Sequence, residues 1–181
     1  ILPQYRLADV IGGGYVTRFG DLEAHLREKF EAAFIETSQL LGARMLVGSS
    51  RLEGEFRKRI IEGCVYSRKR AYFEALAAEV RGRRKAKARL GCAVDHDVKE
   101  SEGGLRDLEM AMLLLKVSHE AEGPLGAGLL RAIAERHPEE RETCAELGDS
   151  YDFLNRLRDL YRLTVCPNNY LDPAHFEHPA S

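Results

Sequence analysis

The chain has 181 residues, of which 44% are hydrophobic and 31% are charged, a composition typical of a soluble globular protein with a sizeable core. The formal net charge of −2 gives no general attraction to nucleic acid, and no apolar run of about 18 residues is present that would span a membrane. The four cysteines form no C-x-x-C pair, which argues against a disulfide framework or a zinc site, so we expect a cytoplasmic protein.

The N-terminal region, residues 1–19, is the only part of the chain with a convincing strand pattern. β-Favouring residues flank the three glycines at 12–14, which lack the G-x-x-x-x-G-K-[ST] spacing of a phosphate-binding P-loop. We therefore interpret these glycines as a bend or bulge in a sheet. Because the chain begins with Ile1 rather than Met, we also expect it to be a piece of a longer protein.

Two long helical segments follow the strand region. Apolar residues spaced near i, i+4 predict one amphipathic helix over 21–47, with Asp21 as its N-cap and Gly48 just after its end. The pattern over 50–90 is also helical, and we interpret Gly63 as a break between two helices. The expected buried faces are formed by Leu22, Leu26, Phe30, Phe34, Leu41 and Met45 in the first segment, and by Phe56, Ile60, Cys64, Phe73, Leu76 and Val80 in the second.

The end of the second segment is strongly basic, with six Lys or Arg residues among the nine from Arg81 to Arg89. Most such runs are solvated faces of helices, and we predict that this run is mainly exposed to solvent. The alternative is a basic rim that attracts a triphosphate or an acidic partner surface.

A pair of glycines, Gly103 and Gly104, precedes a helical apolar pattern that begins at Leu105. Lys99 lies before this predicted helix start and Arg106 lies in its first turn. A helix start with free backbone N–H groups and two nearby cations is a suitable site for an anion. The alternative is an ordinary helix that is capped by Ser101 or Asp97, with glycines for a tight turn.

The acidic run before this turn, Asp95-His96-Asp97, offers carboxylate and imidazole groups that can bind metals. Adjacent side chains on an extended segment point to opposite faces, so the three cannot easily converge on one ion. We therefore predict no metal site among these residues.

The remainder of the chain is also predicted to be helical. A helix with one buried face is expected from Leu105 to Val117, and its inward residues include Leu108, Met112 and Leu115. Another helix is expected after Gly123-Pro124, and a long one over 139–163. Residues 166–181 are rich in turn-forming residues and are expected to form an irregular tail.

Six of these residues match the K-x-x-x-G-G-L-R-D signature of bacterial PII-protein uridylyltransferases, and the glutamine synthetase adenylyltransferases carry a close relative of it. They are Lys99, Gly103, Gly104, Leu105, Arg106 and Asp107. Weaker resemblance to the same family is found around Tyr15, Thr17 and Arg18, over residues 37–49 and over residues 153–158. The chain has Ser101-Glu102 where the family has Gly-Pro before the paired glycines.

The resemblance implies a mainly α fold, a helical bundle with a small N-terminal β remnant of a polymerase-β-like nucleotidyltransferase domain. Residues 1–50 would be the end of that domain. Residues 51–165 would form the helical domain that follows it, and residues 166–181 would be the irregular tail. Helices with apolar stripes and short connections bury those stripes against one another, which agrees with a bundle.

The resemblance also implies an activity, the Mg²⁺-dependent transfer of UMP or AMP from a nucleoside triphosphate to a protein, in signal transduction of the nitrogen-regulation type. The expected partners are a nucleotide and a protein substrate, with no membrane and no nucleic acid. Lys99, Gly103, Gly104, Arg106 and Asp107 would bind nucleotide or phosphate, with Asp107 orienting Arg106 or capping the helix.

Thr17 and Arg18 would belong to the same nucleotide site. The family's catalytic segment, in which D-x-D follows G-S by about ten residues, is not present, because Gly48-Ser49 has no such pair after it. We interpret Gly48-Ser49 as a helix end, and the catalytic residues are therefore unknown. The alternative function is a non-catalytic helical regulatory or scaffold domain of a signalling protein.

Overall fold

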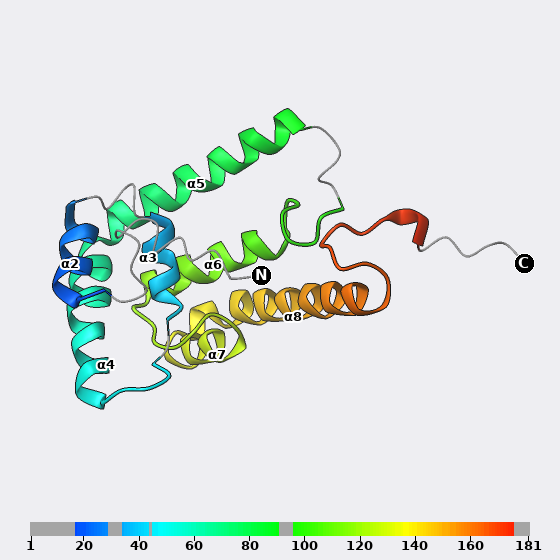
Figure 1. The fold of residues 1–181 in the computed structure, drawn as a ribbon. Helices are drawn as coiled ribbons and strands as arrows, with labels where there is room; N and C mark the ends of the chain where they lie inside the picture. Colours follow the sequence, from blue (N-terminus) through cyan, green and yellow to red (C-terminus); the bar gives the residue numbers. More distant parts are fainter. Residues whose placement is uncertain (1–16, 29–33, 44, 91–95, 176–181) are drawn as a thin grey trace, which may run out of the picture.

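The computed structural model describes residues 17–28, 34–43, 45–90 and 96–175, except the side chains of 87–90 and of Pro173. Over these ranges the protein is mainly helical, as predicted (Figure 1). The elements in chain order are α2 (Phe19–Glu28), α3 (Phe34–Leu41), α4 (Ser50–Phe56), the π-helix η1 (Arg57–Val65), the 3₁₀ turn η2 (Tyr66–Arg68), α5 (Lys69–Leu90), α6 (Leu105–Ser118), α7 (Ala127–Arg136), η4 (Pro138–Glu140), α8 (Arg141–Thr164) and η5 (Pro173–His175).

The predicted N-terminal strand falls mostly on residues 1–16 and so lies outside the described residues. Its expected last residue, Phe19, is instead the first residue of α2. Asp21 is therefore not an N-cap, because it lies in the first turn of α2. There its carboxylate is close to the positive end of the helix dipole, where a negative charge is favourable.

The helix predicted over 21–47 is wrong at its C-terminal end, because α3 stops at Leu41. The N–H groups of Gly42 and Ala43 bond to carbonyls only three residues earlier, which tightens and ends the helix. Gly48 adopts a positive φ of 153°, and the Ser49 side chain accepts a hydrogen bond from the N–H of Leu52. Gly48-Ser49 therefore begins a helix, with Ser49 as the N-cap of α4, rather than ending one.

The predicted helical segment 50–90 is confirmed, but its break is not at Gly63. Gly63 lies inside the π-helix η1, and the irregular turn η2 comes three residues later. Figure 1 shows that α4 and α5 run in different directions on either side of these two elements. A π-helix and a 3₁₀ turn interrupt the regular α-helical ladder, so the direction can change here without a glycine break.

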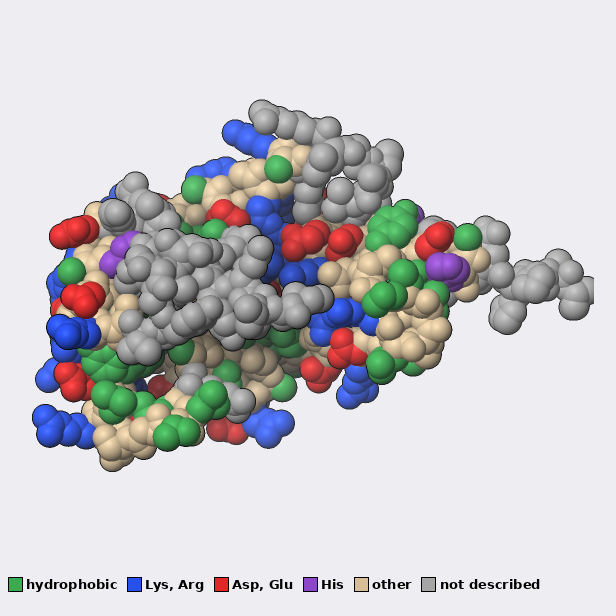
Figure 2. Space-filling model, in the orientation of Figure 1, with side chains coloured by type: hydrophobic (Ala, Val, Ile, Leu, Met, Phe, Trp, Pro, Cys, Tyr) green, Lys and Arg blue, Asp and Glu red, His purple; other side chains and the backbone are tan. Residues whose placement is uncertain are grey.

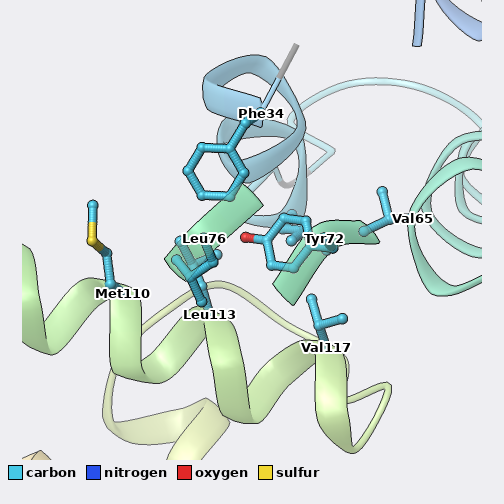
Figure 3. Close-up of a cluster of buried hydrophobic side chains, with 8 residues drawn as sticks. Phe34, Val65, Tyr72, Leu76, Met110, Leu113 and Val117 are labelled. Carbon is cyan, nitrogen blue, oxygen red and sulfur yellow. The ribbon is translucent and has the colours of Figure 1, made fainter. Parts of the chain in front are cut away.

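Helix α6 lies at the centre of the molecule and is buried on two faces rather than on one. Met110, Leu113 and Val117 pack against α3 and α5 in a first core cluster, which Figure 3 shows around Phe34 and Tyr72. The second cluster joins α6 to α7 and α8. Its buried members are Met112, Ala121, Leu129, Leu130, Ile133, Cys144 and Leu147, with Leu108 and Leu115 partly buried beside them.

A third cluster packs α2 against η1 at one end of the molecule, and its buried residues are Leu22, Leu26, Ile60 and Cys64, as the spacing predicts. Burial raises the pKa of the Cys64 thiol, so this cysteine behaves as a small apolar core residue. None of the described helices has the length and hydropathy that a membrane crossing requires.

Candidate functional site

The turn that carries the signature, residues 97–107, is closed by hydrogen bonds within itself. The Asp97 carboxylate oxygen Oδ1 accepts from the N–H groups of Lys99 and Glu100, both at 2.8 Å. The N–H of Ser101 donates to the carbonyl of Asp97 at 2.8 Å. Asp97 therefore organises the turn before the helix rather than capping α6, whose N-cap residue is Gly104.

Each glycine of the signature has its own structural reason. Gly103 has a φ of +72°, a left-handed conformation that side chains with a Cβ rarely adopt. Gly104 has an ordinary φ, but a Cβ on it would lie 2.8 to 3.0 Å from the carbonyl oxygens of Val98, Lys99 and Ser101. The glycine pair is thus explained by the geometry of the turn, with no need for a ligand.

The N–H groups at the start of α6 are not free, so that part of the sequence interpretation is wrong. The N–H of Leu105 donates to the carbonyl of Val98 at 2.9 Å, and the N–H of Arg106 donates to the carbonyl of Lys99 at 3.0 Å. The N–H of Gly103 donates to Oδ2 of Asp107 at 3.1 Å. This last contact gives Asp107 the role of a helix cap, one of the two roles that the sequence suggested.

Arg106 is shared between two carboxylates on the surface of the turn. Its Nη1 lies 3.3 Å from Oε2 of Glu109, and its Nη2 lies 3.7 Å from Oε1 of Glu100. The side chain is 39% exposed, so solvent screens both pairs and an incoming anion can reach the guanidinium.

Arg83 of α5 also reaches the turn, which the sequence did not predict. Only 17% of its side chain is exposed, and its Nη2 donates to Oε2 of Glu100 at 2.5 Å. The prediction of an exposed basic run is therefore wrong for Arg83. The same prediction is confirmed for Arg84, whose side chain is 63% exposed and lies 3.6 Å from Glu102.

Lys99 is the cation of the turn that has no carboxylate partner among the described residues. It is half-buried, and no hydrogen bond or ion pair joins its ammonium group to the parts of the chain that the structure describes. Figure 2 shows acidic and basic side chains side by side between the end of α5 and α8. A half-buried lysine without a partner is well suited to pair with an anion there.

Thr17 and Arg18 are not brought to this turn. They lie immediately before α2, which packs on η1 at one end of the molecule, whereas the signature turn lies at the other end of α6 (Figure 1). Arg18 is exposed and its carbonyl accepts the N–H of Leu22. The structure thus groups five of the seven residues that the resemblance assigns to the site.

The segment after α8 supports the signature turn by backbone pairing. The N–H of Val98 donates to the carbonyl of Asn169 at 2.9 Å, and the N–H of Leu171 donates to the carbonyl of His96 at 2.8 Å. An antiparallel bridge joins Asp97 to Tyr170. The residues expected to form an irregular tail therefore include a short strand-like partner for the turn.

Of the Asp95-His96-Asp97 run, Asp95 lies outside the described residues. Asp97 uses its Oδ1 for the turn. Over the residues that the structure describes, no group of three or more His, Cys, Asp or Glu side chains is arranged to hold a metal ion.

The family model of the GlnD PII-uridylyltransferases matches residues 71–165, more than half of the chain, and this stretch contains the whole signature turn. The chain belongs to this family. Membership of this family relates the chain to the nucleotidyltransferases. A search of the curated proteins and a search of the solved structures each found no match. The supporting segment 169–171 lies outside the matched residues of the family, although it bonds directly to the signature.

Proposed function

We propose that this chain is part of a nucleotidyltransferase that moves UMP or AMP from a nucleoside triphosphate to a protein side chain, with Mg²⁺, in nitrogen-regulation signalling. The observation that carries the proposal is Lys99, which has no carboxylate partner among the described residues and lies beside Arg106 at the start of α6, within the stretch that matches the family. Catalysis of this kind depends on positioning and on neutralising phosphate charge, for which such cations are suited.

The phosphates would be bound by side chains rather than by backbone N–H groups, since those groups already have partners. Lys99 would contribute a full charge. Arg106 would exchange its contacts with Glu100 and Glu109 for contacts with phosphate oxygens. A triphosphate concentrates several negative charges, so it competes well with two partly exposed carboxylates. The dipole of the 14-residue helix α6 also favours an anion at this end.

The described residues fit the phosphate part of the nucleotide, and Mg²⁺ would arrive with the triphosphate. They offer no cluster of carboxylates for the ion, and the D-x-D segment of the family's catalytic site is not among these residues. When bound, the ion would neutralise phosphate charge. Asp107 would keep the turn closed by accepting the N–H of Gly103.

The test is calorimetric titration with UTP, ATP and CTP in the presence of Mg²⁺. Removing one charge-assisted contact, by Lys99→Ala or Arg106→Ala, should weaken binding by about 1.5–3 kcal/mol, or roughly ten- to a hundredfold. Lys85→Ala is the matched control, because Lys85 is exposed on the basic face of α5. Circular dichroism of each variant separates lost binding from lost folding.

The second candidate function is a non-catalytic regulatory or scaffold domain. It is favoured by the satisfied N–H groups at the start of α6 and by the pairing of Arg106 with two carboxylates. This function requires no triphosphate binding. If wild type binds none of the three nucleotides, the scaffold function replaces the enzymatic one. If wild type binds and both variants bind equally well while folded, the phosphate role of the signature is wrong.

A further inference from the structure

A second site lies at the other end of α6, where a pocket of about 890 Å³ opens between the segment before α4, the helices α4 and η1, and the connection after α6. Its walls are largely apolar, and Leu40, Met45, Leu46, Leu52, Phe56 and Ile61 are among the residues that line it. This volume is within the range of about 300–1,000 Å³ that small-molecule sites occupy. Lys116 in this pocket lies about 16 Å along the helix from Leu105, given the rise of 1.5 Å per residue.

One lysine is buried in this apolar pocket. Lys116 is 4% exposed, and its Nζ donates to the carbonyl of Gly123. An ammonium group has three N–H donors, and none of the described residues accepts a second one. Burial lowers the pKa of Lys116 to about 8, because apolar surroundings disfavour the charged form of a lysine.

Glu122 is the acidic group whose charge acts on Lys116, but it is not the ion partner of that lysine. Glu122 is 58% exposed and pairs with Nη1 of Arg57 at 2.5 Å. Within the described part of the chain no carboxylate comes within ion-pair distance of the Lys116 ammonium group. A buried cation without an anion is costly, so an anion that enters the pocket gains more here than at the surface.

The entrance of the pocket is apolar as well. Leu46 is 78% exposed and Val47 is 93% exposed, and both line the pocket. Figure 2 shows hydrophobic side chains gathered over α4 and the segment that leads into it. Isolated exposed apolar side chains are ordinary, but two adjacent ones, Leu46 and Val47, beside an apolar pocket indicate a surface that an apolar chain can cover.

We propose that this pocket binds a small amphipathic carboxylate, with its head group on Lys116 and its hydrocarbon chain along the apolar walls. The charge of Lys116 selects an anionic head, and the largely apolar walls select an apolar body. Each methylene that the walls bury should strengthen binding about fourfold.

The test compares octanoate with octanamide, its uncharged analogue, by titration calorimetry on the whole chain. Octanoate should bind wild type at least tenfold more tightly than octanamide, and decanoate more tightly than octanoate. Lys116→Met keeps the length and apolar body of the side chain, so octanamide should bind as before while the preference for octanoate disappears. Lys85→Met, at an exposed position of α5, should keep that preference.

The pH profile gives an independent readout. The other charged or titratable groups that line the pocket are Glu53, Arg57, Tyr66 and Glu122. Burial raises the pKa of Tyr66 to about 12, so its phenol stays protonated at pH 9. Above about pH 8, Lys116 must take up a proton from the solvent when octanoate binds, so the affinity for octanoate should fall by up to about tenfold per pH unit. The same titration of Lys116→Met removes the contribution of the other groups.

Three outcomes would overturn the proposal. Wild type could bind neither compound, it could bind octanoate and octanamide equally well, or Lys116→Met could keep the preference for octanoate while circular dichroism shows a folded protein. None of these outcomes depends on nucleotide binding at the signature turn, so the two proposals stand or fall separately.

Discussion

Arg83 and Glu100 join the long helix α5 to the signature turn. Nη2 of Arg83 lies 2.5 Å from Oε2 of Glu100, and its Nη1 lies 3.9 Å from Oδ1 of Asp107. Glu100 precedes the paired glycines and Asp107 follows them. One arginine therefore contacts both sides of the turn, and it also reaches the sulfur of Met110 in the core at 3.7 Å.

The first prediction concerns the strength of this link. A double-mutant cycle with Arg83→Met and Glu100→Gln should give a coupling free energy of about 1–2 kcal/mol, because Arg83 is largely buried. The matched cycle at the exposed pair Arg84 and Glu102 should give less than about 0.5 kcal/mol. Chemical denaturation provides both values, and equal coupling in the two cycles would refute the role of Arg83.

The exposure of Arg84 leads to a second prediction. The charge reversal Arg84→Glu should change the free energy of unfolding by no more than about 0.5 kcal/mol, since the side chain is 63% exposed and its ion pair is long. The melting temperature should therefore hardly change. A large loss of melting temperature would show that this part of the basic run is structural as well.

The two glycines should respond differently to alanine. Gly104→Ala places a Cβ within 3.0 Å of three backbone carbonyl oxygens, which cannot move without opening the turn. It should cost more than about 2 kcal/mol. In Gly103→Ala the added Cβ meets no atom within 4 Å, and only the left-handed φ is unfavourable for alanine. This variant should therefore lose about 1 kcal/mol of stability. Thermal denaturation of the two variants measures this order, and a larger loss at Gly103 would contradict it.

Truncation on α6 tests the position of its buried faces. Met112 is fully buried, so Met112→Ala should cost about 2–5 kcal/mol. Leu108 is only partly buried beside the same cluster, and Leu108→Ala should cost less than Met112→Ala does. Urea denaturation with a common slope gives both free energies, and the reverse order would mean that the register of α6 is wrong.

Stability at alkaline pH depends on Lys116. Its pKa of about 8 in the folded protein is below the ordinary value of 10.5, so between these pH values the unfolded chain binds a proton that the folded protein does not. Relative to Lys116→Met, the free energy of unfolding of wild type should therefore rise by up to about 3 kcal/mol from pH 8 to pH 10.5. Tyr66 and Tyr72, whose pKa values burial raises to about 12, act in the opposite direction above pH 10. Both tyrosines are present in wild type and in Lys116→Met, so their effects cancel when the two free energies of unfolding are subtracted. If that difference did not change between pH 8 and pH 10.5, the burial of the Lys116 charge would be disproved.

Local patterns were sufficient to predict the helical class, the start of α6 after the paired glycines and the family. Helical periodicity, the turn chemistry of Gly103-Gly104 and a short signature are all properties of neighbouring residues, so they can be recognised without a fold. The same patterns placed Ile60 and Cys64 correctly in the core. They failed at Leu41, where α3 ends, because an apolar sequence such as 45–47 resembles a continued helix.

Contacts between distant segments decided the rest, and no local pattern contains them. The N–H of Arg106 is satisfied by a carbonyl that only the folded turn brings within reach. Arg83 is buried because the signature turn packs against the end of α5, and His96 pairs with Leu171 because the chain returns after α8. Lys116 is buried because the connection at Gly123 folds over it, and among the described residues its ammonium group has a backbone carbonyl as partner but no carboxylate.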